Sequence, residues 1–248
     1  MTTSLAVLLV VLALAFASMA AFAVLHRGRR DADAARKGSR FLLGAGDFLV
    51  HWFMWAIGPA ERALTAAGAT PDHMNAGGLL FGLASGVAIA LGRLELGGWA
   101  IALAGVCDIL DGRLARARGL ASPYGKFIDS TLDRFVETFA FLGFAVYFAS
   151  RPWGPLVVAA GLGGSLLVSY AQARGETVNV SGSGGLMQRA ERLVLTLLGC
   201  LLDPPVSRAI GRPEGAVLFW VLALVAAGAL ATAVHRTVFI ARRLRAGA

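Results

Sequence analysis

Long apolar runs separated by short polar segments dominate the chain. Several of them reach or approach the roughly 17–25 residues that an α-helix needs to cross a bilayer. The pattern predicts membrane-crossing helices at residues 5–25, 76–92, 98–117, 125–148, 155–173, 189–202 and 216–236. It therefore predicts an all-α polytopic membrane protein, with a last turn at residues 203–215.

The first apolar run has no basic residues before it and is followed by Arg27, Arg29 and Arg30. A signal peptide carries its basic residues ahead of the apolar stretch. We therefore interpret residues 1–40 as a retained transmembrane anchor, with its N-terminus outside, and a basic cytoplasmic linker. The small residues at 18–23 leave a cleaved signal peptide as the alternative.

Residues 41–66 mix aromatic and charged side chains and are too polar to cross a bilayer. They predict an amphipathic helix that lies in the membrane interface, with Trp52 and Trp55 at headgroup depth. Tryptophans that contact a ligand are the alternative interpretation. Residues 67–248 are expected to form a six-helix membrane domain.

Four aspartates interrupt the apolar pattern, in the order D-x2-D-G-x2-A-R-x8-G-x3-D-x3-D from residue 108 to 133. An acid at the centre of a lipid-facing helix costs roughly 2.5–3.5 kcal/mol, and less near an interface. Asp108 and Asp111 share one helix face, and Asp129 and Asp133 share one face of the next helix. Because these helices are antiparallel neighbours, we expect the four carboxylates to converge.

Mutual repulsion between these carboxylates calls for cations. Oxygen donors without a nearby His or Cys favour Mg²⁺, Mn²⁺ or Ca²⁺ over zinc. Two such ions suit phosphoryl transfer because they clamp the attacking and leaving oxygens. Asp133, the deepest of the four on its helix, is then a candidate to accept a proton from an attacking hydroxyl.

Small and basic residues accompany the acids. Gly112 and Ala115 allow a ligand to approach the backbone, and Arg116 is placed to hold a phosphate. No G-x4-G-K-[ST] loop is present, so a P-loop nucleotidase is not supported. The alternative to a site is a set of buried ion pairs between the acids and nearby arginines, namely Arg113, Arg116, Arg118 and Arg134.

The spacing resembles the motif of the CDP-alcohol phosphotransferase family, and all eight fixed positions match. The resemblance extends from about residue 70 to the last helix. It implies a six-helix membrane core preceded by an interfacial helix, usually in a homodimer, so residues 5–25 would be one extra N-terminal transmembrane helix. It also implies transfer of a phospho-alcohol group from a CDP-linked donor to a hydroxyl, with release of CMP.

The resemblance implies roles for individual residues. Asp108, Asp111 and Asp129 look like ligands of one divalent cation, Mg²⁺ or Mn²⁺, while Asp108, Asp129 and Asp133 look like ligands of a second, with Asp133 as the catalytic base. Asn75 stands where the family usually has threonine. The expected nucleotide-binding residues are Asp72, Asn75, Gly112, Ala115, Arg116 and Gly125.

Residues 169–176 and 188–192 are similar to segments of phosphatidylinositol-phosphate synthases. Arg174 and Arg192 match basic residues that hold the acceptor's phosphate there, and Arg236 is a candidate third. Gln172 stands where those enzymes usually have lysine, and Lys126 compensates if it faces the site. The alternative for each arginine is an ordinary basic flank on the cytoplasmic side.

These features predict an enzyme that transfers the phosphatidyl group of CDP-diacylglycerol to a polyol phosphate, with inositol phosphate as the leading acceptor. Glycerol phosphate, serine, or a neutral polyol or amino alcohol are alternative acceptors. A non-catalytic lipid- or ion-handling membrane protein is the alternative from another class.

The 248-residue chain carries a net charge of +8, from 23 Lys and Arg against 15 Asp and Glu. In a membrane protein this charge marks cytoplasmic flanks that meet anionic lipid headgroups, so no nucleic-acid partner is expected. It also places the acidic site on the cytoplasmic side of the inner membrane. Cys107 and Cys200 lie in apolar runs and indicate neither a disulfide framework nor a zinc site.

Overall fold

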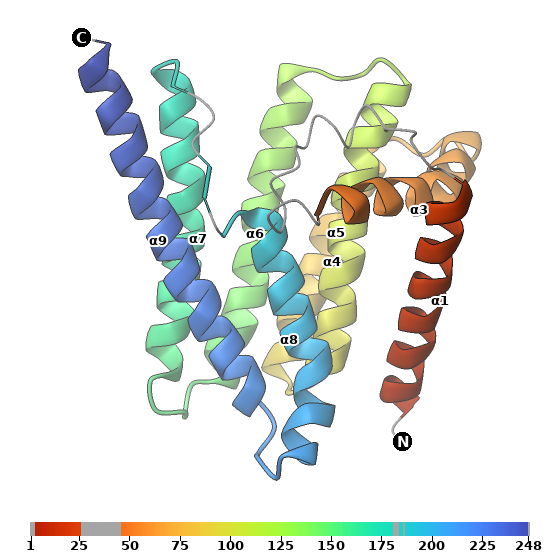
Figure 1. Ribbon diagram of the computed structural model, residues 1–248, viewed down its shortest axis with the longest axis vertical. Helices are drawn as coiled ribbons and strands as arrows, with labels where there is room; N and C mark the ends of the chain where they lie inside the picture. The colour runs from red at the N-terminus through yellow and green to blue at the C-terminus, as the bar shows by residue number, and fades with distance from the viewer. Residues whose placement is uncertain (1–2, 26–45, 181–183, 186, 248) are drawn as a thin grey trace.

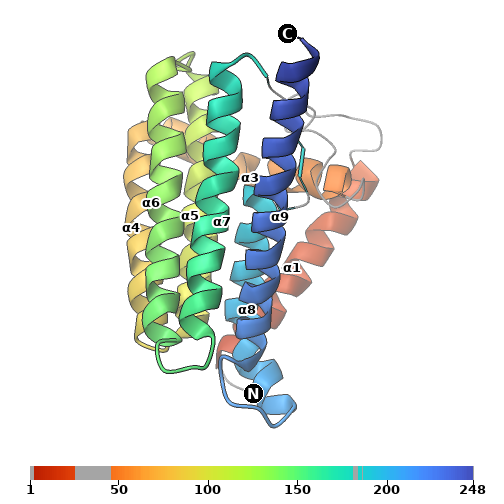
Figure 2. The same ribbon diagram turned by 90° about the vertical axis from the view of Figure 1, so that its left-hand side faces the viewer.

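The computed structural model describes residues 3–25, 46–180, 184–185 and 187–247, and within these ranges its regular elements are all α-helices. Six of them run alongside one another as a bundle (Figures 1 and 2). They are α4 (Pro71–Ala90), α5 (Leu94–Ala117), α6 (Pro123–Tyr147), α7 (Gly154–Thr177), α8 (Arg189–Ala209) and α9 (Ala216–Ala246). The predicted all-α fold with a six-helix core is confirmed.

Three of the described helices, α4, α7 and α9, are long and apolar enough to cross a bilayer, and residues Leu9–Leu25 form a shorter apolar helix. Their large apolar side chains also point outward, as Leu80, Leu83 and Val87 of α4 show. Such exposure is unfavourable in water and natural in lipid. The protein is therefore an integral membrane protein.

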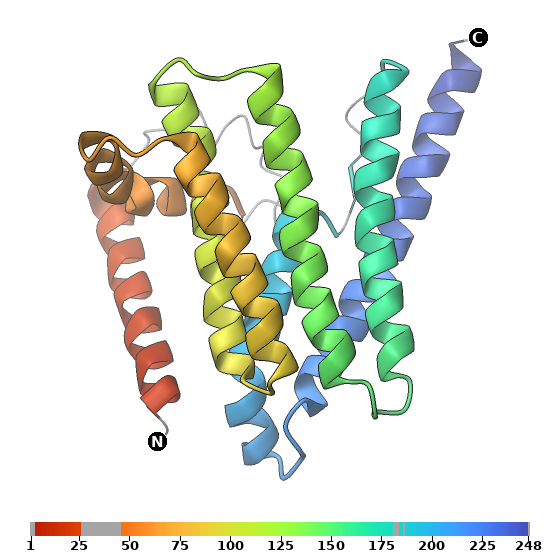
Figure 3. The same ribbon diagram turned by 180° about the vertical axis from the view of Figure 1, so that it is seen from behind.

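Small residues bring α4 close to α6, which crosses beside it when the bundle is seen from behind (Figure 3). A Cβ atom added to Gly82 would lie 2.8 Å from the Val136 side chain. One added to Gly143 would lie 2.9 Å from the Cα of Gly86. Helices in lipid associate through such close packing. Because α4 also packs on α5, it forms one wall behind the two acidic helices.

The expected turn at residues 203–215 is wrong in its first half, because α8 continues through Pro204 and Pro205 to Ala209. Prolines remove backbone donors and usually break a helix. Here Asp203 accepts a 3.1 Å hydrogen bond from Ser207 Oγ, one turn on, and holds the segment helical. Its carboxylate also accepts from the backbone N–H groups of Gly215 (2.6 Å) and Leu218 (2.9 Å), at the start of α9.

Helix α3 (Gly46–Ala66) runs crosswise to the bundle helices and contacts α5, and α1 (Thr3–Leu25) stands at the side of the bundle next to α3 (Figure 1). A helix is thus present where the interfacial helix is predicted, and its position in the membrane interface stays a prediction; residues 41–45 and the linker at 26–40 lie outside the described residues. Trp52 Nε1 donates a 2.9 Å hydrogen bond to Ser18 Oγ of α1. The Trp55 ring packs on Phe22. These two tryptophans therefore join α3 to α1 and line neither cavity described below. The division of the chain at residues 40 and 66 stays a prediction.

Candidate active site

The α5–α6 connection brings the four aspartates to one end of the bundle. Gly119 takes a left-handed φ of 66°, which glycine adopts without strain and which lets the chain turn after α5. Ser122 then caps α6, because its Oγ accepts a 3.1 Å hydrogen bond from the backbone N–H of Gly125. Helix α6 therefore starts close to the end of α5 and runs antiparallel to it.

Three of the acids form a compact cluster. Asp108, Asp111 and Asp129 each offer a carboxylate oxygen, and these oxygens lie within 4.8 Å of one another. Asp111 is the most enclosed, with 5% of its surface exposed. Carboxylates this close repel one another unless a cation lies between them. A hard, oxygen-preferring ion such as Mg²⁺ or Mn²⁺ fits this donor set.

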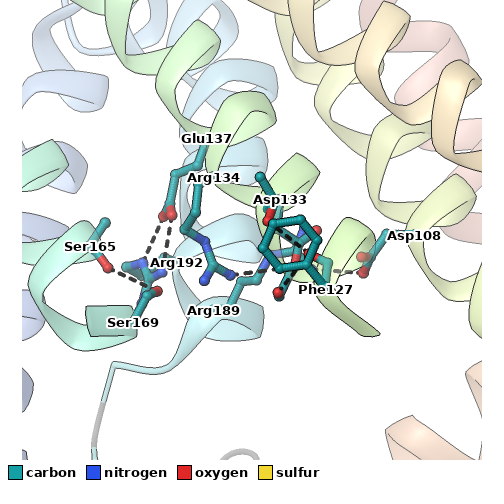
Figure 4. Close-up of polar contacts among 11 residues, drawn as sticks. Asp108, Phe127, Asp133, Arg134, Glu137, Ser165, Ser169, Arg189 and Arg192 are labelled. Atoms are coloured by element: carbon teal, nitrogen blue, oxygen red, sulfur yellow. Dashed lines mark hydrogen bonds and ion pairs between the residues drawn. The ribbon is translucent and has the colours of Figure 1, made fainter. Parts of the chain in front are cut away.

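The fourth acid, Asp133, faces a basic residue from α8 (Figure 4). Arg189 Nη1 donates a 2.7 Å hydrogen bond to Asp108 Oδ2, and its Nη2 forms an ion pair with Asp133 Oδ1. Arg134 Nη2 lies 3.4 Å from the other oxygen of Asp133. The guanidinium of Arg189 therefore bridges one acid of α5 and one acid of α6.

A cavity of about 280 Å³ opens over these acids between α4, α5, α6 and α8. Its lining combines polar side chains with the apolar surface of α4. The lining residues are Met74, Asn75, Gly78, Leu79, Ala104, Asp108, Asp111, Asp129, Leu132, Asp133, Val136 and Arg189. All four predicted acids thus line one cavity, as their spacing predicts.

A second cavity, of about 450 Å³, adjoins the first and shares Asp133, Val136 and Arg189 with it. Its other polar lining residues are Glu137, Arg192 and Thr196. The first cavity thus combines four acids with Arg189, and the second combines Asp133 and Glu137 with two arginines of α8.

The predicted nucleotide residues take different positions around the first cavity. Asn75 lines it, whereas Asp72, in the first turn of α4, is exposed and does not. Gly112 lies beside the guanidinium of Arg116, and a Cβ there would come within 3.2 Å of Arg116 Nη1. Arg116 is exposed at the end of α5, so it is accessible to a ligand.

The other two predicted nucleotide residues are partly buried near the α5–α6 connection. Ala115 lies one turn after Asp111, and Gly125 lies one turn before Asp129. Both residues have small side chains, which leave the helix backbone accessible. Their positions suit a ligand that approaches the backbone closely.

Arg192 and Arg236 are both buried. Arg192 donates to the two carboxylate oxygens of Glu137, at 2.8 and 3.2 Å (Figure 4), and to the carbonyl of Met187. Arg236 Nη1 donates to the carbonyl of Val168 and to Gln172 Oε1. The Nε of Arg236 has no hydrogen-bond partner in the described residues.

The remaining acceptor candidates lie at the exposed ends of α6 and α7. Arg174 is exposed, and Lys126 pairs with Glu176 at 3.2 Å. Gln172 Nε2 also donates to Glu176, at 3.3 Å. Arg174, Lys126 and Gln172 line neither cavity, so the structure does not bring them together with Arg192.

Two residues of the site were not singled out by the sequence reasoning, Arg189 and Glu137. Glu137 continues the four-residue spacing of Asp129 and Asp133 along α6, so a signal for it was present. Of the arginines in the alternative of buried ion pairs, Arg113 pairs instead with Glu61 of α3 at 2.5 Å, whereas Arg134 pairs with Asp133 at 3.4 Å.

Comparison with known proteins supports the family that the acidic motif resembles. The sequence profile of CDP-alcohol phosphatidyltransferases matches residues 69–230. A phosphatidylinositol phosphate synthase of Mycobacteroides abscessus is 38% identical over 154 residues, covering 58% of this chain and 68% of that protein. The region matched by the family profile, residues 69–230, contains all four aspartates of the acidic motif.

Solved structures of a Mycobacterium tuberculosis phosphatidylinositol phosphate synthase share the fold. The form with CDP-DAG bound has a TM-score of 0.64 at 29% identity and covers 73% of this chain and 92% of that one. The form in complex with manganese and citrate has a TM-score of 0.65 at 28% identity, with coverages of 73% and 87%.

Proposed function

Because the chain belongs to the CDP-alcohol phosphatidyltransferase family, we propose that it transfers the phosphatidyl group of CDP-diacylglycerol to inositol phosphate and releases CMP. The observation that carries this proposal is the meeting of all four motif aspartates in one cavity between α5 and α6. The similar synthases, one of them solved with CDP-DAG bound, support the donor and the acceptor.

Two divalent cations, Mg²⁺ or Mn²⁺, are the proposed cofactors. Asp108, Asp111 and Asp129 would hold one, and Asp108, Asp129 and Asp133 would hold the other. The close cluster of carboxylate oxygens and the manganese complex of a similar synthase support this assignment. When bound, such ions neutralise charge on the reacting phosphate and on the departing oxygen.

The reaction then needs one proton acceptor from the protein. Asp133 takes the proton of the acceptor hydroxyl as that oxygen forms a bond to the phosphorus that carries diacylglycerol. The bond between this phosphorus and the oxygen of CMP breaks, so CMP leaves with the bonding electrons. Asp133 lines both cavities, and this supports a position between the proposed donor side and the proposed acceptor side.

The donor nucleotide is proposed to lie over the start of α4 and the end of α5. Asn75 lines the first cavity, and Arg116 is exposed beside Gly112. Asp72, Ala115 and Gly125 complete the proposed nucleotide-binding set at the same end of the bundle. The lipid chains then extend along the apolar faces of the helices, toward the bilayer.

The acceptor phosphate is proposed to bind Arg192 and Arg236, with Arg174 at the entrance. Arginines suit this role because their planar guanidinium groups bind phosphate through two hydrogen bonds. The unpartnered Nε of buried Arg236 and the lining position of Arg192 support it. Lys126 lies farther out, paired with Glu176, and would adjust the charge at the entrance.

The site is proposed to lie at the cytoplasmic face of the inner membrane. The basic residues that follow the first span and end α9 favour this orientation. The start of α1 and the end of α9 also lie at opposite ends of the molecule (Figure 1), as an N-terminus outside requires. A homodimer is part of the proposal, on the basis of the family's usual assembly.

An acceptor panel tests the proposal. Purified protein with CDP-diacylglycerol and Mn²⁺ is supplied separately with inositol phosphate, inositol, glycerol phosphate or serine, and CMP release is followed. We expect CMP only with inositol phosphate, together with a lipid product of the matching mass. The Asp133→Asn variant, prepared in the same way, is the control for release that does not depend on the site.

A neutral acceptor is the second candidate, because Gln172 replaces the usual lysine and accepts a hydrogen bond from Arg236. CMP release with inositol but not with inositol phosphate would support that candidate and contradict the first. Release with glycerol phosphate or serine alone would also overturn the acceptor. Absence of CMP with every acceptor, in protein that still binds Mn²⁺, would favour a non-catalytic lipid- or ion-handling protein.

A further inference from the structure

Arg189 places its guanidinium group between two of the four motif aspartates. Its Nη1 donates to Asp108 Oδ2 at 2.7 Å, and its Nη2 is paired with Asp133 Oδ1. Arg134 lies 3.4 Å from the remaining oxygen of Asp133. Both oxygens of the proposed base therefore face guanidinium groups.

This arrangement competes with the proposed second cation. Asp108 and Asp133 are two of the three acids assigned to that ion, and the guanidinium of Arg189 lies against both of them. A guanidinium next to the ion would also repel it. A position of Arg189 away from Asp133 therefore favours binding of the second cation.

A released Arg189 side chain can extend into the second cavity, which it already lines. Arg189 lines both cavities, and Arg192 lies one turn further along α8, in the lining of the second cavity. The charge of Arg192 is already matched there by Glu137. A guanidinium that moves from Asp133 into this cavity adds an unmatched positive charge, as an acceptor phosphate requires.

We infer that Arg189 is a specificity-determining residue that exchanges between two partners. It neutralises Asp108 and Asp133 before the second cation binds, and it contacts the acceptor's phosphate once the cation has replaced it. This inference rests on the proposed function and supplies the positive charge that Gln172 lacks. By linkage, acceptor phosphate then strengthens binding of the second cation, because both favour the same position of Arg189.

The first test measures Mn²⁺ binding to the full-length protein in detergent, by the electron paramagnetic resonance signal of free Mn²⁺. Without substrates, Arg189→Gln should bind the second Mn²⁺ about tenfold more tightly than wild type, a change equivalent to about 1.4 kcal/mol. Arg134→Gln is the matched control, because it also removes an arginine beside Asp133 but from outside both cavities. Its effect should be smaller.

The second test adds inositol phosphate. The acceptor should tighten Mn²⁺ binding in wild type and not in Arg189→Gln. The KM for inositol phosphate should rise about tenfold or more in Arg189→Gln, as expected for loss of a charged contact, and should stay unchanged in Arg134→Gln. Arg189→Lys keeps the charge without the two-pronged bridge, so it should gain Mn²⁺ affinity and retain most acceptor binding.

Unchanged or weaker Mn²⁺ binding by Arg189→Gln would overturn the inference, since it would make Arg189 a support for the metal ligands. An unchanged KM would overturn the role in acceptor binding. If Arg189→Gln does not fold, the same Mn²⁺ comparison on Arg189→Lys decides. Failure of wild type to release CMP with inositol phosphate would contradict the proposed function alone, because the substrate-free Mn²⁺ comparison would still stand.

Discussion

The two ends of the bundle both bury carboxylates, but they surround them differently. At the end where α8 meets α9, Asp203 is completely buried and accepts hydrogen bonds from Ser207, Gly215 and Leu218. Nearby, Arg151 donates to the carbonyl of Gly215 and lies 4.5 Å from the ring of Phe219. The backbone partners of Asp203 there hold the end of α8 against the start of α9.

At the opposite end, the carboxylates face one another. Asp108, Asp111 and Asp129 gather within 4.8 Å, and Asp108 and Asp133 form ion pairs with arginines. A buried acid that accepts several backbone hydrogen bonds stabilises a fold. A group of acids that repel one another favours a bound cation, so the contrast supports a structural role for Asp203 and the proposed metal-binding role for the cluster.

Removal of divalent cations should produce the largest difference between the two ends. A chelator should abolish CMP release, because the clustered acids then lose the ions that neutralise the reacting phosphate. Added Mn²⁺ or Mg²⁺ should restore the release, and Asp203 should be unaffected because its partners are protein groups. Full turnover in the presence of the chelator would contradict the assignment.

Asp133→Asn should have the next largest effect. Loss of a general base typically lowers the rate by about 10²–10⁴-fold, so CMP release should fall by that order. The thermal unfolding temperature should stay near that of wild type, since the lost attraction to Arg189 and Arg134 is offset by weaker repulsion from the neighbouring aspartates. A parallel loss of stability and turnover would place Asp133 in the structural class with Asp203.

Arg192→Gln should weaken the acceptor rather than the donor. A hydrogen bond to a charged group contributes about 1.5–3 kcal/mol, so the KM for inositol phosphate should rise roughly 10- to 100-fold. The KM for CDP-diacylglycerol should change little. Glu137→Gln is the informative companion, because it frees Arg192 from its carboxylate partner and removes no cation. Equal losses for donor and acceptor would argue against a separate acceptor cavity.

Asp203→Ala should act at the other end of the bundle. It leaves the backbone N–H groups of Gly215 and Leu218 without their acceptor, and a buried unpaired donor costs about 1–3 kcal/mol. The free energy of unfolding should drop by about that amount for each of the two donors. The folded fraction should retain its KM values, and a change in acceptor preference would show that the two ends are coupled.

Lys126→Gln should have the smallest effect. Its partner, Glu176, is exposed, and exposed pairs contribute about 0–1 kcal/mol. Both KM values and the unfolding temperature should stay close to wild type. A large rise in the acceptor's KM would show instead that Lys126 supplies the charge that Gln172 lacks.

The sequence predicted the helices and the meeting of the acids because both depend on local spacing. An apolar run long enough to cross a bilayer has few structural choices. Asp108 and Asp129 then meet because their helices are antiparallel neighbours. The end of α8 was mispredicted, because the side chain of Asp203 organises residues up to 15 positions away, which no local pattern shows.

The bridge made by Arg189 was also beyond local reasoning. Arg189 and Asp108 are 81 positions apart, and the packing of α8 on α5 brings them together. A basic residue at a cytoplasmic helix end is ordinarily an exposed flank. Glu137 differs, because it continues the spacing of Asp129 and Asp133 and was predictable from the helix period.

Direct measurement of Mn²⁺ binding tests the central claim most simply, because it needs neither donor nor acceptor. Wild-type protein should bind two Mn²⁺ ions per chain, and Asp111→Asn should lose or strongly weaken one of them. Asp203→Asn, which changes a buried carboxylate outside the cluster, should still bind two. No Mn²⁺ binding by wild type, or equal binding by wild type and Asp111→Asn, would contradict the account.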